Sequence, residues 1–240
     1  EDIIENQLVT VTINGEKFEG NPTETILDIS ERNGISIPRL CYKEGMRPDG
    51  NCRVCMVEIE GERALQPSCA RTITNGMIIN TSGKRVKHSQ KLVLELLTAD
   101  VSEKIYDKES ELTGWSNQLQ IQKHRFPSNV QKKHDISHPA IAVNLDACIQ
   151  CTRCVRACRE EQVNDVIGYA QRGIKSEIVF DLDDQMGDST CVGCGECVQA
   201  CPTGALMPSN DAGLNIPDKK VDSVCPYCGV GCLLTYNVKN

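Results

Sequence analysis

The chain has 240 residues, of which 15 are cysteines and only 4% are aromatic, so aromatic packing alone cannot organise it. Lysine and arginine number 26 against 33 acidic residues, and the resulting net charge of −7 disfavours nucleic-acid partners and anionic membrane surfaces. No apolar run reaches the ~18 residues that cross a bilayer. No export signal follows Glu1, and the chain is rich in thiols, so we expect a cytoplasmic protein without a membrane span.

The first part of the chain predicts a small domain of strands and one helix. Apolar and polar residues alternate over 8–20 around Asn14-Gly15, a pair typical of a two-residue hairpin turn. A short helix is expected to begin at an N-cap, either Thr23 or Thr25, and to end at Gly34. Further short strands are predicted at 57–59 and 77–79.

Four cysteines of this first part follow a C-x10-C-x2-C-x13-C pattern: Cys41, Cys52, Cys55 and Cys69. Plant-type 2Fe–2S ferredoxins also hold three cysteines in one loop and a distant fourth, although their first gap is x4. Glycines at 45 and 50 make the first loop flexible enough to fold over a cluster. We therefore predict a 2Fe–2S site, with four-cysteine zinc coordination as the alternative.

The middle of the chain predicts a helix followed by a connector without regular structure. Apolar residues recur at helical spacing over 84–97, and residues 100–139 are polar and aperiodic, with Trp115 and Phe126 as isolated apolar anchors. This region contains four histidines that no ligand constellation surrounds, so we interpret them as surface residues. They are His88, His124, His134 and His138.

Two C-x2-C-x2-C-x3-C runs follow, and they form an internal repeat offset by 43 positions, from Cys148 to Cys191. Neighbouring cysteines in such runs are too close for unstrained disulfides, and structural zinc sites usually pair two separated C-x2-C motifs. The pattern is that of bacterial ferredoxins with two 4Fe–4S clusters, in which the fourth cysteine of each run binds the other cluster.

This rule predicts two crossed sets of ligands. One cubane is expected on Cys148, Cys151, Cys154 and Cys201, and the other on Cys191, Cys194, Cys197 and Cys158. Glycines at 193 and 195 are expected to bend the backbone so that N–H groups face sulfur. Arginines surround the first run and acidic residues flank the second, so the reduction potentials of the two cubanes can differ. The alternative is that these side chains are solvated surface charges without such an effect. These residues are Arg153, Arg156, Arg159, Asp188 and Glu196.

The C-terminal segment, 221–240, contains two predicted short strands on either side of the sequence CPYCGVGC. The strands are expected at 221–224 and 233–238. Cys225, Cys228 and Cys232 supply three ligands, so a third 4Fe–4S cluster needs a fourth cysteine downstream. Half a zinc knuckle or free thiols are the alternatives.

The cysteine pattern of residues 8–83 resembles the 2Fe–2S domain that opens the respiratory NADH dehydrogenase large subunit, iron-only hydrogenases and NAD-linked formate dehydrogenases. This resemblance implies a β-grasp ferredoxin fold. Many members of these families bind an extra cubane through one His and three Cys in the connector. Because no cysteine lies between Cys69 and Cys148, we expect that cluster to be missing here. The CPYCGVGC segment resembles the opening of molybdenum or tungsten bis-pterin oxidoreductases, above all formate dehydrogenases.

The order of motifs thus resembles the N-terminal portion of the catalytic subunit of an NAD-linked or cytoplasmic formate dehydrogenase. The expected α+β organisation is a β-grasp 2Fe–2S domain at 1–83, a helix and connector at 84–140, a double-cubane ferredoxin-like domain at 141–210 and, at 221–240, the start of a molybdopterin oxidoreductase domain. The resemblance implies that the molybdenum or tungsten bis-pterin lies outside this sequence.

The function expected from this resemblance is an electron relay for formate oxidation. It implies an NAD-reducing flavin/iron–sulfur subunit, or another acceptor protein, as partner in a hetero-oligomer. We identify no catalytic residue in the chain. The alternatives are a stand-alone multi-cluster electron carrier and the N-terminal part of an iron-only hydrogenase or of an NADH dehydrogenase large subunit; CPYCGVGC argues against the hydrogenase, and the missing His/Cys cluster against the NADH dehydrogenase.

Overall fold

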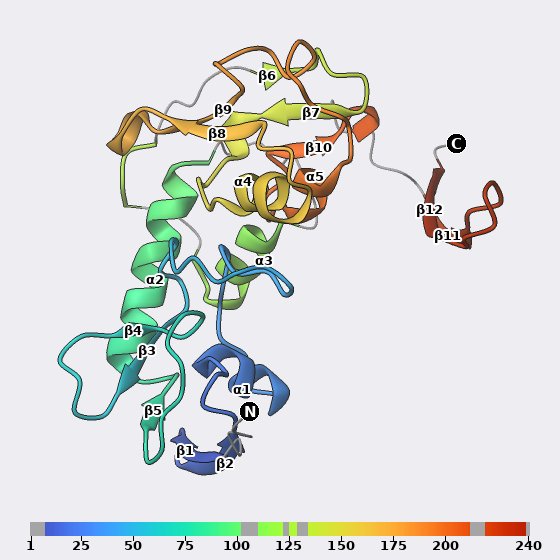
Figure 1. Cartoon of the computed structure of the whole chain (residues 1–240). Helices are drawn as coiled ribbons and strands as arrows, with labels where there is room; N and C mark the ends of the chain where they lie inside the picture. Colours follow the sequence, from blue (N-terminus) through green and yellow to red (C-terminus); the bar gives the residue numbers. More distant parts are fainter. Residues whose placement is uncertain (1–7, 102–109, 122–124, 129–133, 212–218, 239–240) are drawn as a thin grey trace, which may run out of the picture.

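The protein combines small sheets with short helices. The computed structural model describes residues 8–101, 110–121, 125–128, 134–211 and 219–238 (Figure 1). No helix within these segments is both long and apolar enough to cross a membrane.

The N-terminal part is a five-stranded sheet in the order β2-β1-β5-β3-β4. Its strands are β1 (Val9–Ile13), β2 (Glu16–Gly20), β3 (Met56–Ile59), β4 (Gln66–Pro67) and β5 (Ile78–Asn80). Strands β1 and β2 pair antiparallel around Asn14 and Gly15, which both have positive φ, so the predicted hairpin is present. Strand β1 also pairs parallel with β5, and alternate side chains such as Val11 and Ile13 are fully buried in the core of this part.

Helix α1 (Ile26–Arg32) packs its apolar side into the same core. Thr25, one of the two predicted N-caps, forms a capping box: its hydroxyl accepts from the Asp28 N–H at 3.2 Å, and the Asp28 carboxylate accepts from the Thr25 N–H at 2.9 Å. Gly34 follows the helix with a φ of +74°. The helix begins and ends where the capping residues predict.

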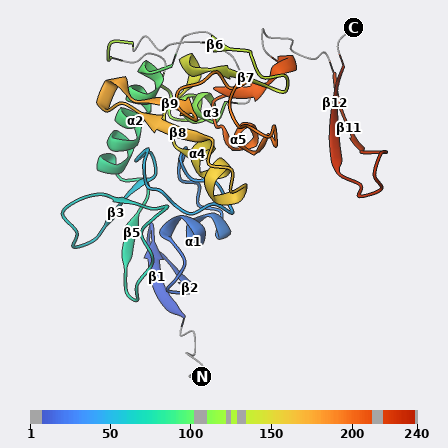
Figure 2. The same cartoon turned by 45° about the horizontal axis from the view of Figure 1, so that its top comes forward.

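Helix α2 (Lys84–Ala99) runs from the N-terminal sheet toward the cysteine-rich repeat, as Figures 1 and 2 show. Helix α3 (Glu111–Gln118) packs against it, within the segment predicted to lack regular structure, so that prediction is wrong there. Ser110 caps α3 by accepting from the Thr113 N–H. The fully buried Leu94 of α2 and the buried Leu112 of α3 share one apolar cluster with Cys41 and Cys151, which links the two ends of the molecule.

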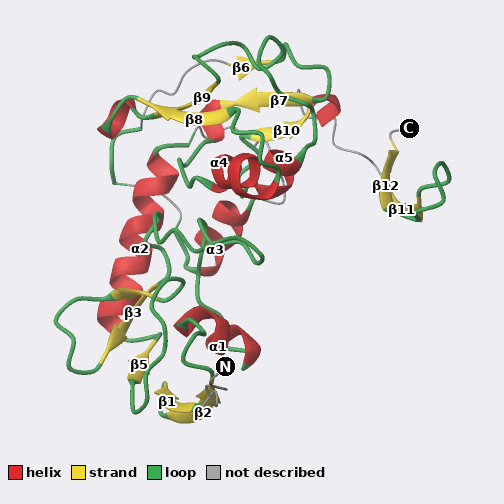
Figure 3. Ribbon diagram, viewed as in Figure 1, coloured by secondary structure: helices red, strands yellow, loops and turns green. Residues whose placement is uncertain are grey.

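The repeat region contains a three-stranded sheet in the order β10-β7-β6 and the hairpin β8-β9 (Figure 3). Its strands are β6 (His134–Asp135), β7 (Ile141–Asn144), β8 (Ile167–Ala170), β9 (Glu177–Phe180) and β10 (Leu206–Pro208). Helix α4 (Arg153–Arg156) continues into a π-helical turn, Ala157–Glu161, and both pack against α5 (Glu196–Ala200). Short 3-10 turns are formed by Leu145–Ala147, Gly173–Lys175 and Ser209–Asp211.

The last described segment is an antiparallel hairpin of β11 (Lys219–Val224) and β12 (Leu233–Val238). The CPYCGVGC sequence forms the loop between these strands, and the Cys225 N–H donates to the Cys232 carbonyl at 2.8 Å. Every side chain of β11 is exposed.

Candidate iron–sulfur sites

The structure brings the four cysteines predicted for the 2Fe–2S cluster together. Cys41, Cys55 and Cys69 are buried and Cys52 is partly buried, and the Cys41 N–H donates to the Cys52 sulfur at 3.4 Å. Hydrogen bonds from Cys52, then from Cys69, lower the pKa of the Cys41 thiol to about 2. The hydrogen bonds to Cys41 raise the pKa values of Cys52 and Cys69, so these thiols share their protons.

Such a site suits a cationic group. Burial disfavours several thiolates side by side unless positive charge compensates them, and iron does so while displacing the protons. The hydroxyl of Ser68, next to Cys69 in the chain, is fully buried and lies beside the Cys55 thiol, whose pKa it helps the Cys69 side chain to lower. It supplies a donor directed at the four sulfurs, so the residues present fit a cluster.

The first run converges with the last cysteine of the second run. A small cavity is lined by Cys148, Cys151, Cys154 and Cys201, together with Leu145, Ile149, Ile178, Pro202, Thr203, Ala205 and Leu206. Burial raises the pKa of the Cys148 thiol to about 12 and also raises those of Cys151 and Cys154. Among the described residues, no three His, Cys, Asp or Glu side chains meet closely enough to hold a single metal ion. Cys148, Cys151, Cys154 and Cys201 line a common cavity and do not converge on a single point.

The second run groups with the last cysteine of the first run. Burial, followed by the charges of Cys191, Cys194 and Cys158, raises the pKa of the Cys197 thiol to about 12. Cys158 lies in the π-helical turn after α4, and this turn packs against α5, which carries Cys197. Cys194 is exposed, so this group of sulfurs reaches the surface.

The repeat seen in the sequence is also present in the backbone. Gln150 and Gly193, at equivalent positions, have φ values of +54° and +68° and donate their N–H groups to the sulfurs of Cys148 and Cys191, both at 3.4 Å. A second equivalent pair, Thr152 and Gly195, precedes α4 and α5 with φ values of +68° and +79°. The N–H···S contact expected at Gly193 is thus present, and its counterpart occurs in the first run.

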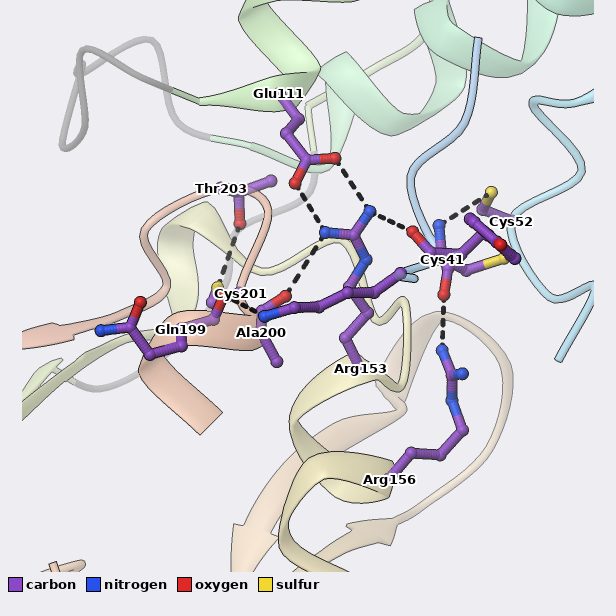
Figure 4. Close-up of polar contacts among 11 residues, drawn as sticks. Cys41, Cys52, Glu111, Arg153, Arg156, Gln199, Ala200, Cys201 and Thr203 are labelled. Carbon is purple, nitrogen blue, oxygen red and sulfur yellow. Dashed lines mark hydrogen bonds and ion pairs between the residues drawn. The ribbon is translucent and has the colours of Figure 1, made fainter. Parts of the chain in front are cut away.

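The arginines of the first run differ in environment, and Figure 4 shows the contacts of two of them, Arg153 and Arg156. Arg153 and Arg156 are 3% and 4% exposed, whereas the Arg159 side chain is 55% exposed and pairs with Asp165 at 2.6 Å. Arg159 is therefore a solvated surface residue. Arg153 and Arg156 are not, because their buried side chains donate to backbone carbonyls of the N-terminal part. These contacts join residues more than a hundred positions apart, so no local pattern in the sequence indicated them.

The histidines also divide into two groups. His88 and His134 are exposed, as predicted, and His124 lies outside the described residues. His138 is only 8% exposed, so its interpretation as a surface residue is wrong. Its Nδ1 accepts from the Ala140 N–H at 3.1 Å, and its ring lies against Gly193, in the loop of the second run.

The three cysteines of the C-terminal hairpin remain an incomplete set. Cys225 is partly buried, and Cys228 and Cys232 are exposed. No fourth cysteine joins them among the described residues.

Comparisons with known families define the class of protein. Residues 6–84 match the 2Fe-2S iron-sulfur cluster binding domain, 147–205 the 4Fe-4S dicluster domain, and 218–240 the molybdopterin oxidoreductase Fe4S4 domain. The chain is therefore a multi-cluster iron–sulfur electron-transfer segment of an oxidoreductase, with the start of a molybdopterin-type domain.

Its relatives carry several different names. It is 34% identical to an NADH-quinone oxidoreductase subunit of Rhizobium meliloti over 97% of this chain and 28% of the relative. It is 34% identical to the NADP-reducing hydrogenase subunit HndD of Solidesulfovibrio fructosivorans, over 83% of this chain and 36% of that one, and 26% identical to a putative formate dehydrogenase of Staphylococcus haemolyticus, over 92% and 27%. The chain thus spans roughly a quarter to a third of these relatives.

A solved structure has the same fold. A chain in the crystal structure of NAD+-reducing [NiFe]-hydrogenase in the H2-reduced state matches with a TM-score of 0.79 at 27% identity, covering 87% of this chain and 90% of that chain.

Proposed function

We propose that this chain is the iron–sulfur electron relay of a molybdenum- or tungsten-dependent formate dehydrogenase. The convergence of Cys201 with Cys148, Cys151 and Cys154 around one cavity supports the relay most directly. It is the arrangement expected when the fourth cysteine of each run completes the other run's cluster. The match of 218–240 to the molybdopterin oxidoreductase Fe4S4 domain and the putative formate dehydrogenases among the relatives support the link to formate.

The proposal assigns ligands as the sequence predicts. The 2Fe–2S cluster takes Cys41, Cys52, Cys55 and Cys69 in a β-grasp domain; the two cubanes take Cys148, Cys151, Cys154 with Cys201, and Cys191, Cys194, Cys197 with Cys158. A third cubane takes Cys225, Cys228 and Cys232 with a ligand from outside this sequence. When bound, these clusters accept and donate one electron at a time. The chain's own residues supply thiolates, exclude water and direct N–H groups toward sulfur.

Two cysteine substitutions test the crossed ligands. Cys201→Ser should alter the cubane of the first run, and Cys158→Ser that of the second, in the low-temperature electron paramagnetic resonance spectrum of the dithionite-reduced protein. Iron and acid-labile sulfide in the anaerobic protein should approach the content of one 2Fe–2S and two 4Fe–4S clusters. Stoichiometric zinc with little sulfide would refute the cluster assignment, and uncrossed effects of the two variants would refute the ligand sets.

The electron donor that reduces the clusters distinguishes formate oxidation from a second candidate function, which is NADH oxidation. The 34% identity to an NADH-quinone oxidoreductase subunit favours a relay within an NADH-oxidising complex. Adding formate, NADH or dihydrogen to the anaerobic native complex, and following cluster reduction by visible absorption, distinguishes these functions. Reduction of the clusters by formate supports the first proposal. If NAD then reoxidises the clusters, an NAD-reducing flavin subunit is supported as the partner. Reduction by NADH but never by formate would support the second.

A further inference from the structure

Two buried arginines of helix α4 join the repeat to the loop that carries Cys41 (Figure 4). Arg156 donates from Nη1 to the Arg47 carbonyl and from Nη2 to the Cys41 carbonyl, both at 2.5 Å. Arg153 donates to the Tyr42 carbonyl. The carbonyl of a proposed 2Fe–2S ligand is therefore held directly by a side chain of the repeat.

The position of Arg156 in the chain gives this contact its significance. It lies between Cys154 and Cys158, which are proposed ligands of the two different cubanes. A single buried guanidinium group thus lies on the segment that carries both cubane ligands and bonds to a residue of the 2Fe–2S site.

The two arginines differ in how their charge is balanced. Arg153 forms a bidentate ion pair with Glu111, with N···O distances of 2.6 and 2.8 Å. Arg156 has only carbonyl partners among the described residues, and its Nε is buried without any partner there. A buried positive charge without a carboxylate partner is costly, and the negative charge of a nearby thiolate-bound cluster relieves that cost, the more so the larger that negative charge is. One-electron reduction of a cluster adds such a charge.

Docking of the two parts does not depend on Arg156 alone. Asn51, next to Cys52, donates to the Gln150 carbonyl at 2.9 Å, and Thr152 donates to the Asp49 carboxylate at 2.7 Å. The apolar cluster that contains Cys41 and Cys151 spans the same junction. Replacing Arg156 therefore changes the charge at this junction while other contacts still hold it.

We propose that Arg156 is a positioning residue that orients the Cys41 loop against the repeat and, through its buried charge that no carboxylate neutralises, favours the reduced state of the 2Fe–2S cluster. This inference rests on the proposed 2Fe–2S site. It makes the reducibility of that cluster depend on a side chain of the cubane-binding repeat, so docking of the two parts and electron acceptance are linked.

The test is a redox titration of the intact protein, with the 2Fe–2S signal followed by electron paramagnetic resonance. Arg156→Gln removes the charge and is expected to lower the reduced-to-oxidised ratio of the 2Fe–2S cluster at least tenfold at a fixed potential, a shift of about 59 mV for one electron. Arg156→Lys keeps the charge and should restore most of the ratio. Arg159→Gln is the matched control: it removes the same charge from an exposed position of the same segment, so it should leave the ratio unchanged.

The outcomes distinguish this inference from the proposed function. A wild-type protein without a 2Fe–2S signal overturns the cluster assignment itself. A wild-type signal with equal midpoint potentials in Arg156→Gln and Arg159→Gln overturns only the role of Arg156. If Arg156→Gln does not retain the cluster, Arg156→Lys decides: a potential near that of the wild type supports the charge effect, and a tenfold loss of the reduced form overturns it.

Discussion

Leu94 of helix α2 is the clearest test of how the two cluster-bearing parts are held together. Its side chain is fully buried in the apolar cluster that also contains Cys41 of the N-terminal part and Cys151 of the repeat. Leu94→Ala removes its buried methyl groups and leaves a cavity, a change that costs about 3 kcal/mol or more in closely packed cores. Since ~1.4 kcal/mol is tenfold in an equilibrium constant, the intact state should weaken by about a hundredfold.

The measurement is the loss of cluster absorbance during anaerobic unfolding in urea. For slopes of about 1–3 kcal/mol per molar, the midpoint for Leu94→Ala should fall by about 1–3 M. Leu96→Ala is the matched control on the same helix, because Leu96 is 44% exposed and its replacement should cost far less. Equal midpoints for the two variants would show that the apolar junction does not stabilise the clusters.

Three further substitutions test local features. Gly187→Ala should destabilise the protein by about 1–3 kcal/mol, because the added Cβ would lie 2.6 Å from the Ser137 carbonyl oxygen. Gly114→Ala, in helix α3 with open space at the Cβ, should instead stabilise by about 0.5–1 kcal/mol; both are read from urea midpoints. For Asp135, burial alone would raise the carboxyl pKa, but hydrogen bonds from Ser137 and the Met186 N–H lower it overall. The ionised Asp135 therefore stabilises the fold fully above about pH 4, and this stabilisation is lost as the pH falls through the lowered pKa of the folded state. Asp135→Asn should thus be less stable than the wild type at pH 7, and the difference in stability should shrink in acid. A gap in thermal midpoint that widens in acid would contradict this.

Local rules predicted the N-terminal elements and the cysteine groups because their causes lie within a few residues. The hairpin follows from the positive φ that Asn14 and Gly15 adopt readily, and helix α1 follows from the capping box of Thr25. The spacing of the runs likewise determines which sulfurs can meet, once the crossed arrangement is applied.

Other features escaped prediction because their causes are distant in sequence. Helix α3 contains a glycine and several polar residues, so its apolar period is weak, and packing of Leu112 and Trp115 against α2 stabilises it instead. The burial of Arg156 depends on carbonyls of the Cys41 loop, more than a hundred residues away. His138 is buried against the loop of the second run at Gly193, which lies more than fifty positions away in the sequence.

The two copies of the repeat differ in sequence where the first copy contacts the N-terminal part of the molecule. The backbone needs positive φ at equivalent positions, where the second copy has Gly193 and the first has Gln150, at a cost of about 1–2 kcal/mol for a side chain in this conformation. Two contacts offset that cost: the Gln150 carbonyl accepts from Asn51 across the junction, and the Gln150 side chain donates to the Ser176 carbonyl, within the repeat, at 2.7 Å.

The same asymmetry continues into the helices. Arg153 and Arg156 of the first copy correspond to Glu196 and Gln199 of the second, and only the arginines reach the carbonyls of the Cys41 loop with their side chains. The first copy thus bonds to the N-terminal part through polar and cationic side chains, whereas the second copy meets it through a backbone group, the Gln199 carbonyl, which accepts from Lys43 at 2.7 Å. Because Cys151 of the first run also shares an apolar cluster with Cys41, the arginine contacts and this packing together hold the first run, rather than the second, against the Cys41 loop.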